Sequence, residues 1–115
     1  TGAATTINAA YDTNAGKVVG SFSDSGSPYT GKGTAVVGTI SSTSISFGSK
    51  VIFDASGAAN YTVVAYDSTA QKVVISYSDT GDSYRGKAIV GSVSGTSISF
   101  GTAVTYETKD QQSLG

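Results

Sequence analysis

The segment Tyr11-Asp12-Thr13 to Lys17-Val18-Val19 recurs in the second half of the chain as Tyr66-Asp67-Ser68 to Lys72-Val73-Val74, and this recurrence is the main indication of the fold. Further matching segments, in chain order, are Ser21-Phe22-Ser23-Asp24 with Ser76-Tyr77-Ser78-Asp79, Ala35-Val36-Val37-Gly38 with Ala88-Ile89-Val90-Gly91, and Ser44-Ile45-Ser46-Phe47-Gly48 with Ser97-Ile98-Ser99-Phe100-Gly101. Tyr29, Gly31 and Lys32 match Tyr84, Gly86 and Lys87, which makes Gly33-Thr34 an insertion in the first copy. The chain is therefore a tandem repeat, and we expect its copies over 1–60 and 61–115.

Each copy contains four extended segments bounded by turn residues. We expect them near 6–11, 17–23, 34–40 and 44–53, and again near 61–66, 72–78, 87–93 and 97–106, with the last segment broken at Gly48 or Gly101. Short connections imply antiparallel neighbours, so each copy is predicted to be a four-stranded meander. Asp12 and Asp67 precede the first turn of each copy, where an Asp caps a hairpin by accepting backbone N–H bonds.

Several of these segments carry apolar residues on both faces. Val63-Val64, Val73-Val74-Ile75 and Ile89-Val90 are such runs, and they require cover on both sides. The last segment, Ser97-Ile98-Ser99-Phe100, alternates instead, so one of its faces is polar. Covered inner strands with a half-exposed outer strand are typical of stacked blades. The sequence thus predicts an all-β fold made of two four-stranded antiparallel blades of a β-propeller.

Two other architectures stay open at this point, a duplicated β-sandwich and a β-solenoid. Two blades cannot close a ring, because propellers have about four to eight. We therefore expect a homo-oligomer, in which three or four chains complete the ring, or further blades in a longer parent chain. The chain begins at Thr1 and has no Met, so we expect a processed chain or a piece of a longer one.

The composition excludes several classes of function. The net charge is −1 and the seven Lys and Arg residues are scattered, so nucleic acid is not an expected partner. No apolar run approaches the ~20 residues of a membrane helix, and membrane insertion is not expected either. The chain has no Cys and no His, which removes disulfides, thiolate sites and the commonest catalytic base. We accordingly expect no enzyme, no catalytic residue and no cofactor beyond a weak calcium candidate.

Two turns contain the polar, charged and aromatic residues that best suit a binding site. The second copy has Asp79-Thr80-Gly81-Asp82-Ser83-Tyr84, and the first has Asp24-Ser25-Gly26-Ser27-Pro28-Tyr29. Both resemble part of the Asp box of sialidase-like propellers, with Tyr in place of Trp. That resemblance implies a structural turn whose Asp accepts backbone N–H bonds and whose aromatic ring packs into the blade.

The same turns also suit two functional sites, one for calcium and one for a sugar. Asp79 and Asp82 supply hard oxygens close together, which suits calcium, although the first copy has Ser27 in place of Asp82. Tyr84, Arg85 and Asp82 suit a sugar, because a flat ring and charged hydrogen-bonding groups stand together. The candidate ligand-binding residues are Asp82, Tyr84, Arg85, Asp24 and Tyr29.

The repeat as a whole resembles repeats of uncharacterised phage and environmental proteins, especially tail-fibre, spike and other virion-surface proteins. Ala65-Tyr66-Asp67-Ser68, Lys72-Val73-Val74-Ile75 and Gly95-Thr96-Ser97-Ile98-Ser99-Phe100-Gly101 carry the resemblance. It implies an extracellular or virion-surface module that binds a receptor or glycan within a fibre, spike or lectin-like oligomer. The alternatives are a purely structural decoration or filament subunit and a glycosidase, for which Asp pairs would act as acid and base.

Overall fold

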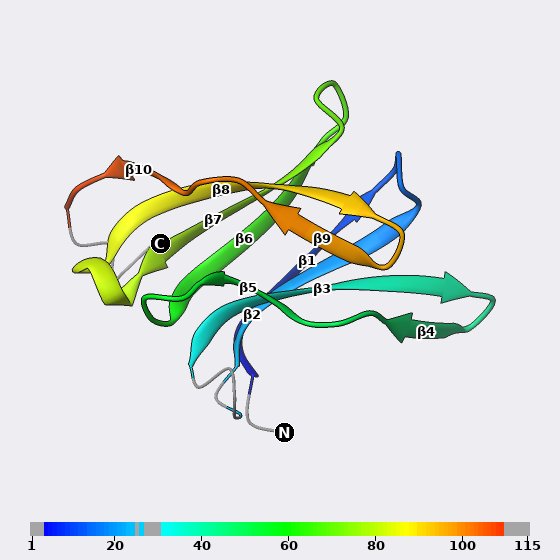
Figure 1. Cartoon of the computed structure of the whole chain (residues 1–115), viewed down its shortest axis with the longest axis horizontal. Coiled ribbons are helices and arrows are strands. Elements are labelled where there is room, and N and C mark those ends of the chain that lie inside the picture. The colour runs from blue at the N-terminus through cyan, green and yellow to red at the C-terminus, as the bar shows by residue number, and fades with distance from the viewer. Residues whose placement is uncertain (1–3, 25, 27–30, 110–115) are drawn as a thin grey trace.

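The computed structural model describes residues 4–24, 26 and 31–109, and Figure 1 shows that most of it consists of strands. The first copy contributes strands β1 (Ala4–Asp12), β2 (Lys17–Asp24), β3 (Lys32–Ser41), β4 (Ser44–Phe47) and β5 (Val51–Asp54). The second contributes β6 (Ala59–Asp67), β7 (Lys72–Asp79), β8 (Arg85–Ser94), β9 (Ser97–Phe100) and β10 (Val104–Glu107), with a short 3-10 turn, η1 (Thr80–Asp82), before β8. None of the helical structure in these ranges is long enough to cross a membrane.

The ten strands form two separate antiparallel sheets. In the N-terminal sheet the order is β1-β2-β3-β4, with β5 also paired to β3; in the C-terminal sheet β6, β7 and β8 follow one another, and both β9 and β10 pair with β8. Each sheet is thus built from one continuous half of the chain. The expectation of an all-β chain with two antiparallel sheets is confirmed.

The expectation of four strands in each copy is wrong in one respect, because each sheet has five. The predicted fourth strand is divided at Gly48 in the first copy and at Gly101 in the second. Gly48 N–H still bonds the Val37 carbonyl at 2.9 Å, and Gly101 N–H bonds the Val90 carbonyl at 3.0 Å. The two pieces therefore run along the same neighbour as one interrupted edge strand (Figure 1).

Strand register corrects the expected position of the insertion. Asp24 pairs with Lys32 in the N-terminal sheet, whereas Asp79 pairs with Arg85 in the C-terminal sheet. Lys32 thus occupies the place of Arg85, and Thr34 occupies the place of Lys87. The extra residues of the first copy lie in the β2–β3 connection and not at Gly33-Thr34, because the β2–β3 ladder continues through both residues without a bulge.

The hairpin role predicted for the two early Asp residues is confirmed. Asp12 Oδ1 accepts the N–H groups of Asn14 and Ala15 at 3.0 and 2.9 Å. Asp67 Oδ1 does the same for Thr69 and Ala70 at 3.0 and 3.1 Å. Each carboxylate accepts N–H groups that have no strand partner in the turn, so both residues have a structural role.

Each sheet has two faces, which we name by the residues of its second strand. The leading face carries Val18, Gly20 and Phe22 in the N-terminal sheet, and the trailing face carries Val19, Ser21 and Ser23. In the C-terminal sheet the leading face carries Val73, Ile75 and Tyr77, and the trailing face Val74, Ser76 and Ser78. Residues paired across neighbouring strands share a face.

The core lies between unlike faces of the two sheets. Its trailing-face members from the N-terminal sheet include Val19, Ala35, Val37 and Phe53, and its leading-face members from the C-terminal sheet include Ala59, Val64, Val73, Ile75, Tyr77, Ile89 and Ile98. β1 and β2 lie against β6, while β3 and β5 lie against β9. Corresponding edges of the two sheets are therefore aligned, and the leading face of one covers the trailing face of the other.

Candidate functional site

The β7–β8 turn places four of the predicted site residues within a few residues of one another. Asp79 ends β7, Asp82 ends η1 and Arg85 begins β8. Ser83 and Tyr84 between them both have a left-handed backbone, with φ of 55° and 60°. The Asp79 carboxylate accepts the Gly81 N–H at 3.0 Å, so this Asp forms the structural turn that the Asp-box resemblance implies.

A chain of ion pairs runs through this turn. Lys87 Nζ lies 2.8 Å from Asp79 Oδ2 and 2.9 Å from Asp82 Oδ2, and Arg85 Nη1 lies 2.7 Å from Asp82 Oδ1. Its bonds to Asp79, and then to Asp82, raise the pKa of Lys87 in spite of its burial. Lys87, followed by Arg85, holds the pKa of Asp82 below its ordinary value.

The same cluster reaches the N-terminal sheet through Ser56. The Ser56 hydroxyl lies 2.7 Å from Asp54 Oδ1 and 2.9 Å from Asp79 Oδ1, so it stands between carboxyl groups from the two sheets. Burial, together with the neighbouring Asp79, raises the pKa of Asp54 to about 6. Burial, the largest single influence, would raise the pKa of Asp79, but the hydrogen bonds from Lys87, Asp54 and Ser56 together outweigh it and lower that pKa. Asp54 therefore holds a proton more readily than Asp79.

The first copy repeats this turn with a different lysine. Asp24 accepts the Gly26 N–H at 2.9 Å, as Asp79 accepts Gly81. Its cation is Lys50, which precedes β5 and lies 2.7 Å from Asp24 Oδ2. The hydrogen bond from Lys50, followed by that from Gly26, lowers the pKa of Asp24. Tyr29, the remaining predicted site residue, lies outside the described residues.

The arrangement does not favour calcium at Asp79 and Asp82. Both carboxylates already bind the Lys87 ammonium, which a calcium ion would have to displace. Calcium takes about six to eight oxygen ligands. In the part of the chain that the structure describes, no three His, Cys, Asp or Glu side chains gather as a metal site would require.

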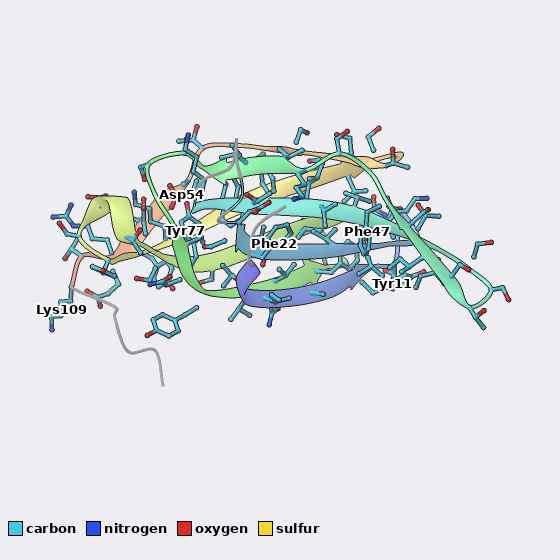
Figure 2. All side chains as sticks on the ribbon, turned by 90° about the horizontal axis from the view of Figure 1, so that it is seen from below. Tyr11, Phe22, Phe47, Asp54, Tyr77 and Lys109 are labelled. Atoms are coloured by element: carbon cyan, nitrogen blue, oxygen red, sulfur yellow. The ribbon has the colours of Figure 1, made fainter. Side chains whose placement is uncertain are left out.

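An apolar pocket of about 430 Å³ lies on the leading face of the N-terminal sheet, away from the predicted turns. Val18, Gly20 and Phe22 form its floor from β2, Val36 adds to it from β3, and Phe47 and Lys50 stand at its side. Figure 2 labels Phe22 and Phe47. For scale, a dry apolar cavity of ~150 Å³ accepts benzene.

The sequence carried a signal for this pocket that composition alone does not show. The position that Ile75 fills in the second copy is Gly20 in the first. A Cβ at Gly20 would find its nearest neighbour, Val36 Cγ1, at 3.6 Å, which is ordinary contact. Gly20 therefore leaves open a volume that an isoleucine occupies in the other sheet.

The opposite end of the molecule presents a second apolar surface, the trailing face of the C-terminal sheet. Its exposed members are Val63, Val90, Val104 and Tyr106. Val90 is 47% exposed, whereas Val37, its counterpart in the first copy, is fully buried. Within the described residues, one face of each sheet is thus uncovered: the leading face of the N-terminal sheet and the trailing face of the C-terminal sheet.

The chain was compared with models of protein families, with curated proteins and with solved structures, and none of them matches.

Proposed function

We propose that the chain is a non-enzymatic assembly module, in which the uncovered leading face of one copy binds the uncovered trailing face of the next. The observation that carries this proposal is the opposite burial of equivalent residues. Val37 and Ile98 are buried inside the chain, while their counterparts Val90 and Ile45 are 47% and 48% exposed. The contact between the two sheets of one chain therefore buries one trailing face and one leading face. A leading face stays exposed at one end of the chain and a trailing face at the other.

Such a joint is heterologous, since the two surfaces in contact are different. Heterologous contacts between identical chains form a closed ring when the rotation closes, and a filament when it does not. Stacked sheets that close around an axis are the blades of a propeller, and about four to eight blades complete one. Three or four copies would supply that number, as would further repeats in a longer chain.

A chain of this kind would be a decoration or filament subunit, the structural alternative that the sequence left open. The proposal is supported by the large share of exposed β-branched and aromatic residues on two opposite surfaces. The resemblance to virion-surface repeats supports an extracellular or virion-surface location for such a subunit.

The test is the mass of the native chain and of one surface variant, Val90→Lys. The chain should form an assembly whose mass is a multiple of 11.5 kDa. Val90→Lys places a charge on the trailing face and should give a folded monomer, because a buried unpaired charge opposes association. Gln71→Lys, in the exposed β6–β7 turn, is the matched control and should assemble normally. A native chain that stays monomeric at every concentration would contradict the proposal.

Glycan binding at the β7–β8 turn is a second proposal, supported by the left-handed backbone of Ser83 and Tyr84. Such conformations in residues other than Gly cluster at ligand sites. The half-buried Tyr84 ring would stack on a sugar, with Asp82 and Arg85 beside it. Binding on a glycan array that Tyr84→Ala and Arg85→Ala abolish would support it, and an array without binding would contradict it.

A further inference from the structure

One aromatic ring defines how the two sheets of the chain join. Phe53, from β5 of the N-terminal sheet, lies 5.1 Å from the Tyr77 ring and 5.7 Å from the Phe100 ring. The contact with Tyr77 is edge-to-face, with 69° between the ring planes. Phe53 thus projects from a trailing face onto two aromatic residues of the next leading face, Tyr77 and Phe100.

Each member of this joint has a counterpart on an uncovered face. Tyr106 of β10 matches Phe53 of β5, Phe22 matches Tyr77, and Phe47 matches Phe100. Phe22 and Phe47 both line the apolar pocket. The pocket therefore contains the counterparts of Tyr77 and Phe100, but no counterpart of Phe53 lies between them.

Tyr106 already has the placement that Phe53 uses. A Cβ at Gly33 would lie 3.0 Å from the Phe53 ring, and a Cβ at Gly86 would lie 3.2 Å from the Tyr106 ring. Gly33 and Gly86 occupy the same register position, opposite Ser23 and Ser78. Each ring thus lies over the equivalent glycine of its own sheet, and no rearrangement is needed before Tyr106 meets a second leading face.

The turn after each ring is also repeated. Ser56 N–H bonds Asp54 Oδ1 at 3.1 Å, and Lys109 N–H bonds Glu107 Oε1 at 2.9 Å. Inside the chain this turn brings Asp54 and Ser56 to Asp79. The corresponding residue of an uncovered leading face is Asp24. In a joint between copies, Glu107 and Lys109 would therefore stand where Asp54 and Ser56 stand, next to Asp24 and its cation Lys50.

We infer that the pocket on the leading face of the N-terminal sheet is the receptor for Tyr106 of a second copy of this chain. The ring enters between Phe22 and Phe47, as Phe53 enters between Tyr77 and Phe100. Each joint then holds one tyrosine and one phenylalanine at the edge-to-face pair. Gly20 makes the pocket deeper than its filled counterpart, which has Ile75 at that position. This inference rests on the proposed assembly and specifies its contact.

The test is a double-mutant cycle on the association constant, measured by sedimentation. Tyr106→Ala and Phe47→Ala should each weaken association at least about tenfold, because truncated aromatic anchors dominate such interfaces. The double variant should be no weaker than the weaker single variant, since the two rings contact each other. Tyr106→Phe should assemble like the native chain, because phenylalanine serves in the internal joint.

The outcomes separate this contact from assembly in general. An assembling chain in which Tyr106→Ala has no effect, or in which the effects of Tyr106→Ala and Phe47→Ala multiply, would overturn the Tyr106 contact and leave the assembly proposal standing. A native chain that never associates would overturn both.

Discussion

Ile45 and Ile98 hold the same position in their repeats, opposite Ile40 and Val93, but Ile45 is 48% exposed and Ile98 is 3% exposed. The local sequences around them are nearly identical, so the difference does not come from the strands themselves. It comes from whether another sheet packs against the strand that carries each isoleucine. β9 packs on β3 and β5 of the other sheet, while nothing in the described residues covers β4 in the same way.

Substitution of these two isoleucines should therefore have unequal effects. Ile98→Ala should lower the free energy of unfolding by about 2–4 kcal/mol, because it leaves a cavity between the sheets. Ile45→Ala should cost less than about 1 kcal/mol in the dissociated chain. Urea denaturation at low protein concentration measures both, and equal losses would contradict the stacking described above.

A hydroxyl group on the Phe53 ring should stabilise the chain. Tyr106 Oη lies 2.8 Å from Ser76 Oγ, whereas the matching Ser21 Oγ is buried and has no hydrogen-bond partner. Phe53→Tyr would give Ser21 that partner, and the expected gain is about 0.5–1.5 kcal/mol. Thermal unfolding of Phe53→Tyr and of the Phe53→Tyr, Ser21→Ala double variant measures it. The gain should vanish in the double variant, and its persistence would contradict the assignment.

Removal of the Lys87 charge should destabilise the chain. Asp79 is 2% exposed and keeps its charge through Lys87, so Lys87→Met leaves a buried carboxylate without its cation. The expected loss is about 1–3 kcal/mol at pH 7. Lys72→Met, at an exposed lysine of β7, should stay within about 0.5 kcal/mol of the native chain. Equal stability of both variants would contradict the role of Lys87.

The pH dependence of stability should reveal Asp54. Its pKa is about 6 in the folded chain and near the ordinary 3.8 when unfolded, so between these values the folded state binds more protons. Stability from this group is present below about pH 4 and is lost as the pH rises through 6.

Asp54→Asn should abolish that loss, because the neutral amide carries no charge for burial and the neighbouring Asp79 to oppose. The variant should match the native chain at pH 4 and be more stable at pH 7, by on the order of 1 kcal/mol. Chemical denaturation across this pH range measures the difference. A native chain that gains stability between pH 4 and 6 relative to Asp54→Asn would contradict the assignment.

The repeat predicted the strands and turns well, because local patterns set them. Tyr11-Asp12 and Tyr66-Asp67 end strands whose hairpins the Asp side chains cap, as expected from the sequence. The division of the last strand was predicted only as a break. Two glycines mark the place, but only the ladder to β3 or β8 decides that both pieces remain paired.

Longer-range features could not be predicted from matching residues. Alignment matched Lys32 with Lys87, whereas strand register places Lys32 at the position of Arg85 and Thr34 at that of Lys87. The cation of Asp24 is instead Lys50, from the segment before β5. The apolar pocket was missed because it depends on which face each sheet leaves uncovered. Gly20 in place of Ile75 signals it only when the stacking is known.

The most direct test of head-to-tail stacking uses two variants, each blocked on one face. Phe47→Lys blocks the leading face and Val90→Lys blocks the trailing face. Each variant alone should be a monomer, because its remaining good face has no partner, and an equimolar mixture should form one-to-one dimers and nothing larger. If either variant alone forms dimers, its intact face binds itself, and the head-to-tail account is contradicted.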